Sequence, residues 1–250
     1  MSLTKESLWM KILTIAGGIA SIVGVVIALF ADQNKAIIAL LSVIVALIII
    51  VGYAVCSLNK FIQTEHPSEY LKLSLFTTFE QTDNTHSKYD GYRLIQSKRP
   101  VLTQVAWGFK WTGKTLPKIS STLQECNGKI NQKTNSYDEV VLQLKKPLKF
   151  NETTVLHFHS EMDDVDHSAQ PHLDVKVDAP ISVVYFRVIL CNKDTDFAEH
   201  ANFKRMPIDS KIPTAYETIE TIVFDKVTRS YQYVLTNPEV GYFYRLEWVK

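Results

Sequence analysis

The chain has 250 residues, of which 46% are hydrophobic and 21% charged, and its formal net charge is +1. A charge so close to neutrality excludes a broad polyanion binder, because such proteins need a strongly basic surface. We therefore expect no direct binding of nucleic-acid polymers. Cys56, Cys126 and Cys191 are odd in number and show no CxxC spacing. They predict neither a disulfide framework nor a zinc finger, and they suit a reducing compartment.

Two apolar segments without a charge, residues 12–31 and 36–58, open the chain. As helices, each reaches about 30 Å, the thickness of the hydrocarbon core of a bilayer. Only residues 32–35 join them, so we expect a two-helix transmembrane hairpin over residues 1–60. A cleaved signal peptide or a buried core helix fits less well, because there is no small-x-small cleavage pattern and there are no regular polar positions.

Lysines near the ends of these segments predict their orientation. Lys5, Lys11 and Lys60 flank the outer ends, and Lys35 alone lies in the connecting loop. Positive residues favour the cytoplasmic side, so we expect a multi-pass protein of the bacterial inner membrane with both termini cytoplasmic.

The first segment also carries a ridge of small residues that predicts close helix packing. Whether this ridge packs within one hairpin or between hairpins of different chains stays open. The ridge consists of Ala16, Ala20, Gly24 and Ala28.

After a linker over residues 61–69, apolar and polar residues alternate with a period of two, as at Leu71, Leu73 and Leu75. Residues 140–145 and 173–177 show the same alternation, and shorter strands are predicted between residues 92 and 249. Residues 181–190 are apolar on both faces and predict a central strand, whereas residues 199–215, with Pro207 and Pro213, predict a long loop. We expect residues 70–250 to form a single antiparallel β-barrel, with a β-sandwich as the alternative.

Two motifs suggest chemistry but lack its structural context. Residues 108–115 match GxxxxGK[ST], yet a phosphate loop must open a helix, and the surrounding pattern predicts strands. His157 and His159 lie two apart on a strand, as metal ligands do, and an acidic stretch follows them. The glycines that frame such a metal motif are missing, so a solvated strand end is the simpler interpretation. We predict no catalytic residues, metal or cofactor, and hence no enzyme.

Two apolar spans, a short linker and a strand-rich region without catalytic motifs form a layout that resembles a known family. It is similar to the two-transmembrane, β-strand-rich effectors of bacterial cyclic-oligonucleotide-based antiphage signalling (CBASS). The resemblance covers the whole chain by architecture and includes no short diagnostic motif. It implies a cytoplasmic β-barrel that binds a cyclic dinucleotide from a nucleotide cyclase. Homo-oligomerisation of the hairpins, inner-membrane disruption and cell death would follow.

A cyclic dinucleotide needs aromatic platforms and a few cationic side chains. Arg187 is the most informative candidate, because a charge in an apolar strand needs compensation by a carboxylate such as Glu247 or by a ligand phosphate. For each aromatic candidate, a place in the core is the alternative. A membrane-anchored scaffold without a small ligand and an anchored hydrolase or metalloenzyme stay open as other functions. The predicted ligand-binding residues are Arg187, Tyr185, Tyr244, Arg245, Trp107 and Trp111.

Overall fold

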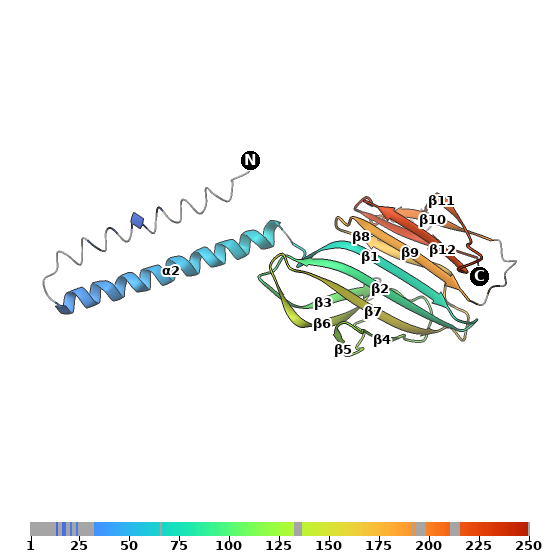
Figure 1. Ribbon diagram of the computed structural model, residues 1–250, viewed down its shortest axis with the longest axis horizontal. Helices are drawn as coiled ribbons and strands as arrows, with labels where there is room; N and C mark the ends of the chain where they lie inside the picture. The colour runs from blue at the N-terminus through green and yellow to red at the C-terminus, as the bar shows by residue number, and fades with distance from the viewer. Residues whose placement is uncertain are drawn as a thin grey trace. The chain divides into compact units, whose positions relative to one another are not determined.

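The computed structural model describes residues 14, 17, 18, 21, 24, 33–65, 67–132, 137–191, 193, 199–210 and 216–249. The chain divides into two compact units, Met1–Thr64 and Glu65–Lys250. The second unit holds all the β-strands that the structure describes (Figure 1).

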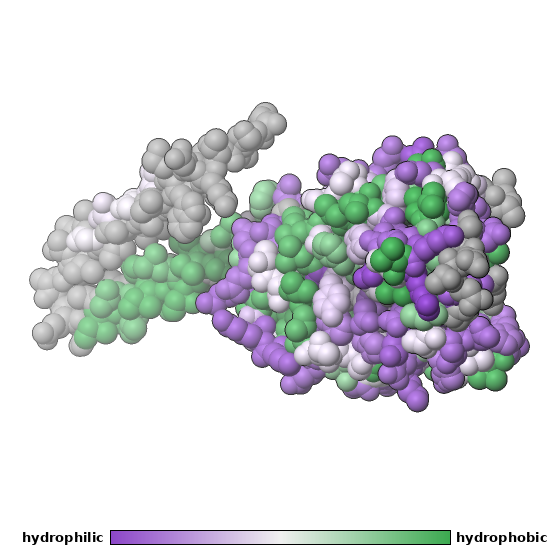
Figure 2. Space-filling view, turned by 45° about the vertical axis from the view of Figure 1, so that its right-hand side comes forward, coloured by the Kyte–Doolittle hydropathy of each residue, from purple (hydrophilic) through white to green (hydrophobic). Residues whose placement is uncertain are grey.

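The first unit contains the helix α2, Gln33–Glu65, except for its last residue. Within Leu40–Glu65, an 18-residue window has a mean hydropathy of 2.7, and this window is not buried inside the protein. Most of the visible surface of α2 is hydrophobic, whereas the β unit shows a mixed surface (Figure 2). Hydroxyls within α2 bond back to the helix: Ser42 Oγ donates to the Ile38 carbonyl oxygen at 2.9 Å. By length and composition, α2 is able to cross a membrane.

The predicted two-helix hairpin is not supported. Among the described residues, α2 is the one helix long and apolar enough to span a membrane, so the multi-pass localisation with both termini cytoplasmic is corrected as well. The first predicted span, residues 12–31, falls largely outside the described residues. Of the predicted packing ridge, Gly24 is helical and exposed, and Ala16, Ala20 and Ala28 lie outside the described residues.

Among the described residues of the β unit, there are thirteen strands. Their bounds are β1 Tyr70–Gln81, β2 His86–Ser97, β3 Val101–Phe109, β4 Lys118–Ser120, β5 Glu125–Cys126, β6 Asp138–Lys149, β7 Thr153–Asp163, β8 His172–Val177, β9 Val183–Leu190, β10 His200–Pro207, β11 Glu217–Val223, β12 Ser230–Thr236 and β13 Tyr242–Glu247.

The strands form three sheets. Sheet A has six strands in the order β12-β9-β1-β2-β7-β4, sheet B has the order β3-β6-β5, and sheet C has the order β11-β10-β13-β8. Sheet A is mixed, because β1 pairs with β2 antiparallel and with β9 parallel. Within the described residues no sheet closes on itself, so the predicted antiparallel barrel is wrong and the fold is sandwich-like.

One face of sheet A, the inner face, is covered by the other two sheets. Over β7, the Phe158 ring stacks on Trp107 of sheet B with centroids 5.4 Å apart. Over β9, the Phe186 ring meets Phe203 of sheet C edge-on at 5.2 Å. These side chains belong to one continuous buried cluster, so burial of apolar area on the inner face holds the three sheets together.

The predicted loop over residues 199–215 is corrected in its first half, which forms β10. Ala201 and Phe203 fill the core from this strand, and Pro207 is its last residue. A proline at a strand end removes no backbone hydrogen bond from the middle of the strand, so it is compatible with strand formation.

Candidate ligand-binding face of sheet A

The outer face of sheet A, opposite the core, carries a row of apolar and aromatic side chains that crosses five strands. Strand register aligns them from β12 through β9, β1 and β2 to β7. Three of them are large and well exposed: Phe76 by 46%, Tyr92 by 42% and Val234 by 55%. His157, at the β7 end of the row, is buried. The exposed apolar side chains of the other strands make this face a candidate binding surface. This aromatic row consists of Val234, Tyr185, Phe76, Tyr92 and His157.

Ring contacts hold the aromatic row in place. The rings of Phe76 and Tyr185 have centroids 6.0 Å apart, and the Tyr92 ring stacks on His157 at 4.5 Å with 26° between the planes. Tyr185 also donates its hydroxyl to Gln232 Oε1 at 2.8 Å. The exposed part of the row therefore carries aromatic rings that are partly fixed by contacts with their neighbours, and such rings can stack with a planar ligand.

A second row of polar side chains runs beside the aromatic row, and on each strand it is two residues away from the aromatic-row member. Arg187 lies between Gln232 and Thr78 in this row. The Arg187 Nε is buried without a hydrogen-bond partner among the described residues. Arg187 interacts electrostatically with Asp225 and contributes to the lowered pKa of that carboxyl, whose main causes are hydrogen bonds within its own turn. This polar row consists of Gln232, Arg187, Thr78, Asp90 and His159.

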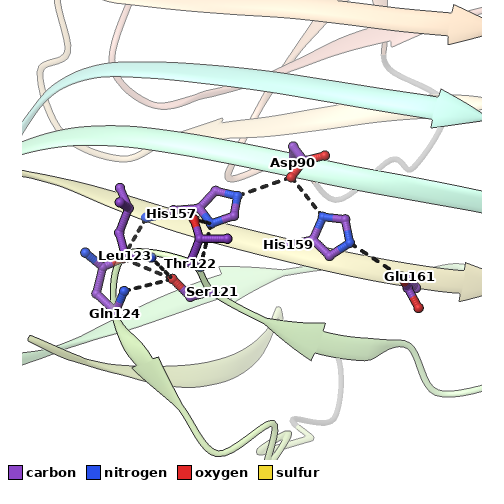
Figure 3. A network of polar contacts seen from close by, with 8 residues as sticks. All are labelled: Asp90, Ser121, Thr122, Leu123, Gln124, His157, His159 and Glu161. Carbon is purple, nitrogen blue, oxygen red and sulfur yellow. Dashed lines mark hydrogen bonds and ion pairs between the residues drawn. The ribbon is translucent and has the colours of Figure 1, made fainter.

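The β7 end of both rows is a connected network of polar contacts (Figure 3). Asp90 Oδ1 lies 3.2 Å from His157 Nε2 and 2.8 Å from His159 Nδ1. The Thr122 backbone N–H donates to His157 Nδ1 at 3.0 Å. A backbone N–H can only donate, so Nδ1 is the acceptor and the proton of the neutral ring lies on Nε2, facing Asp90. The network thus fixes the tautomer of His157.

Gln124 joins the loop that covers His157 to β7 by hydrogen bonds. Its side-chain Oε1 accepts the His157 backbone N–H at 2.8 Å, and its Nε2 donates to the Val155 carbonyl oxygen at 2.9 Å. The Gln124 carboxamide thus takes the place of a neighbouring strand beside Val155 and His157. The next part of β7 pairs with β4. Ser121 Oγ accepts the Gln124 backbone N–H at 3.0 Å and closes the turn. The solvated strand end predicted for this segment is therefore wrong at His157, which is buried.

The predicted ligand residues are spread over several places. Tyr185 and Arg187 do share the outer face of β9, because Phe186 and Val188 point into the core. Trp107 is 1% exposed and belongs to the core. Whether any of these residues binds a ligand stays a prediction.

The remaining candidates lie away from the outer face. Tyr244 is buried, and its hydroxyl oxygen accepts the Glu239 backbone N–H at 3.0 Å. Arg245 makes two hydrogen bonds to Asp174, at 2.7 and 2.8 Å. Trp111 lines a separate cleft on the inner side of sheet A.

Arg187 does not find the carboxylate partner considered from the sequence. Glu247 accepts instead from Lys204 Nζ at 2.8 Å in sheet C.

Phe76 and Tyr92 were missed as site residues. The sequence does contain a signal for Phe76. In the alternation through Leu75, Phe76 is an aromatic residue at a position where a polar, outward-facing residue is expected. The pairing of Phe76 with Tyr92, by contrast, depends on register between strands.

The two motifs discounted from the sequence have structural explanations. Residues 110–117 form a loop between β3 and β4, with no helix at Lys114, whose Nζ pairs with Asp166 at 2.7 Å. A β-carbon on Gly113 would lie 2.5 Å from the Trp111 ring, so the glycine gives space to that indole. Among the described residues, no group of three His, Cys, Asp or Glu side chains is arranged to hold a metal ion.

Comparisons with known proteins give no family. No family model matches the chain, and no curated protein matches it. Among solved structures, a two-domain M1 zinc metallopeptidase bound to L-tryptophan matches with a TM-score of 0.38 and 10% identity, over 72% of this chain and 43% of that chain. Baculovirus P35 matches with a TM-score of 0.39 and 11% identity, over 74% of this chain and 99% of that one. Yeast LTA4 hydrolase with bestatin matches with a TM-score of 0.37 and 7% identity, over 72% and 29%. The chain thus spans less than half of the peptidases.

Proposed function

We propose that the β unit is a receptor for a nucleotide-type ligand and that α2 anchors it to a membrane. The observation that carries the proposal is the pairing, on the outer face of sheet A, of exposed aromatic rings with the Arg187 guanidinium, whose Nε lacks a partner. Planar bases stack on aromatic side chains, and phosphates accept charge-assisted hydrogen bonds from arginine.

The spacing of the two rows fits such a ligand. Side chains two residues apart on a strand share a face and are separated by about 7 Å. Tyr185 and Arg187 have this relation, so a base above the aromatic row would direct a phosphate along the strand toward Arg187. The Asp90 carboxylate in the same polar row faces His157 and His159, which reduces its repulsion of an anion.

A cyclic dinucleotide is the first ligand to test, because the resemblance to CBASS effectors implies one. Its two bases need two stacking surfaces, and Phe76 and Tyr92 are directly paired across β1 and β2. The proposal places the ligand on an open sheet face rather than inside a barrel. An adjacent nucleotide cyclase gene is the expected genomic context.

The test uses the full chain in lipid nanodiscs, titrated calorimetrically with 3′,3′-linked cyclic dinucleotides, a linear dinucleotide and inorganic phosphate. We expect Arg187→Met to weaken cyclic dinucleotide binding by roughly 1.5 to 3 kcal/mol, the range for a charged hydrogen bond. Stability without ligand should not fall, because the variant removes a buried N–H that has no partner. Arg205→Met is the matched control, since Arg205 pairs with Glu217 in sheet C.

Phe76→Ser tests the aromatic row in the same assay and should reduce binding through lost stacking. Absence of saturable binding by every nucleotide, or equal affinity of wild type and Arg187→Met, would refute the receptor proposal. If Phe76→Ser instead converts an oligomer into a monomer without a change in ligand affinity, the exposed row is a contact between copies of the chain.

A further inference from the structure

A cleft of about 110 Å³ lies on the inner side of sheet A, on the opposite side of the sheet from the proposed nucleotide face. Its lining comes from β1, β2 and β7 of sheet A, from β3 of sheet B and from β8 of sheet C. On β7, Phe158, Ser160 and Met162 line it, whereas His157, His159 and Glu161 alternate to the outer side. The cleft is therefore independent of the outer face.

Several aromatic rings line the cleft, and they pack on one another. The Phe109 and Phe158 rings have centroids 5.3 Å apart, and Tyr89 meets Phe158 edge-on at 5.8 Å. Phe79 lies 5.2 Å from Trp248, both at the cleft. Because each ring is held by another, the wall is formed before any ligand arrives.

Two hydroxyl groups of the lining are buried without a hydrogen-bond partner among the described residues: Ser160 Oγ and the Tyr137 hydroxyl. Ser160 is only 2% exposed. Buried hydroxyls are almost always hydrogen-bonded, so two orphans in one small cleft point to a bound molecule that supplies their partners.

The surroundings of the cleft favour a neutral ligand. Two carboxylates line the cleft, and both have hydrogen-bond donors. Asp174 accepts two hydrogen bonds from Arg245, and Asp164 Oδ1 accepts the Ala169 backbone N–H at 2.9 Å. Burial lowers the pKa of His172 and favours its neutral form. Burial also raises the pKa of Tyr137, so its hydroxyl stays protonated and available to donate.

Volume limits the size of the ligand. An engineered apolar cavity of about 150 Å³ in another protein admits benzene, so this cleft has room for about one ring. We propose that it binds a neutral, single-ring aromatic molecule with a hydrogen-bonding group, and that Ser160 Oγ and the Tyr137 hydroxyl contact that group. A cyclic dinucleotide is too large for this place, since ligands of drug size need roughly 300 Å³ or more.

The test compares phenol, benzene and benzoate as probes of the full chain in nanodiscs, by ligand-observed NMR titration with empty nanodiscs as the blank. We expect saturable phenol binding and none of benzoate. Ser160→Ala and Tyr137→Phe should each weaken phenol binding about two- to tenfold, the range of a neutral hydrogen bond, and leave benzene binding unchanged. Ala169→Leu, which places a larger side chain in the cleft lining, should abolish phenol and benzene binding together.

Tyr231→Phe is the matched control, because it removes a tyrosine hydroxyl that donates to the Glu199 carbonyl oxygen at 2.9 Å, away from the cleft. It should not change phenol binding. Ser160→Ala removes a hydroxyl without a partner, so this variant should fold and keep the test interpretable. Lack of saturable phenol binding in the wild type would overturn the proposal. So would a phenol affinity in Ser160→Ala, Tyr137→Phe and Ala169→Leu that equals the affinity of the wild type.

Discussion

Gly91 lies on the inner face of sheet A, and its lack of a side chain makes room for Trp107. A β-carbon added there would lie 2.6 Å from Trp107 Cζ2 and 3.1 Å from the Tyr89 hydroxyl oxygen. Trp107 cannot easily withdraw, because Phe158 stacks on it with 3° between the planes and the Arg93 guanidinium lies 4.0 Å from its ring centroid. We therefore expect Gly91→Ala to destabilise the β unit.

The expected magnitude follows from overpacking. One extra methyl group in a well-packed core costs about 1 to 3 kcal/mol. For a unit of this size, that corresponds to a fall in melting temperature of roughly 2 to 12 °C. The melting temperature is measured by thermal unfolding of the full chain in nanodiscs. Near-ultraviolet circular dichroism is the signal, because it reports on the packing of the tryptophans.

Gly108→Ala is the matched control in the neighbouring strand β3. A β-carbon there meets its nearest atom, Tyr137 Cβ, at 3.6 Å, which is an ordinary contact. This variant should be neutral or stabilising by up to about 1 kcal/mol, because alanine restricts the unfolded chain. A double variant with Trp107→Phe should lose less stability from Gly91→Ala than the wild type does. If Gly91→Ala unfolds at the wild-type temperature, the clamped position of Trp107 is refuted.

Two further predictions concern pH and membrane attachment. Burial lowers the pKa of His172 from 6.5 in the unfolded chain, so the unfolded state takes up the proton first. The stability contribution of neutral His172 should be full above about pH 6.5 and should fall as the pH drops toward the folded pKa. Urea unfolding at pH 7.5 and 5.0 measures the change in the free energy of unfolding. The variant His172→Gln should lose less of this free energy than the wild type between the two pH values, and an equal loss would contradict this role of burial. In α2, Val51→Lys places a charge within an apolar span at a cost of about 2.5 to 3.5 kcal/mol, so less protein should resist carbonate extraction from membranes. Val51→Leu should behave as wild type, and full retention of Val51→Lys would argue against α2 as a membrane span.

Features that depend on neighbouring residues could be predicted from the sequence. The apolar run within α2 needs no distant contact to be recognised, because length and hydropathy decide it. The alternation at Leu71, Leu73 and Leu75 likewise predicts a strand, and β1 contains it. The same local reasoning failed at β10, where Pro207 suggested a loop although it only ends the strand.

Features that depend on the pairing of distant segments were decided by the tertiary structure. A barrel and a sandwich require the same alternation, and the difference arises from which strands pair, such as β1 with β9 in parallel. Register alone brings Phe76, Tyr92 and His157 into one row, since each belongs to a different strand. Likewise, the stacking of Trp107 on Phe158 requires sheet B to cover sheet A. The sequence supplies the alternation of faces, but which face is buried is determined by the sheets that cover it.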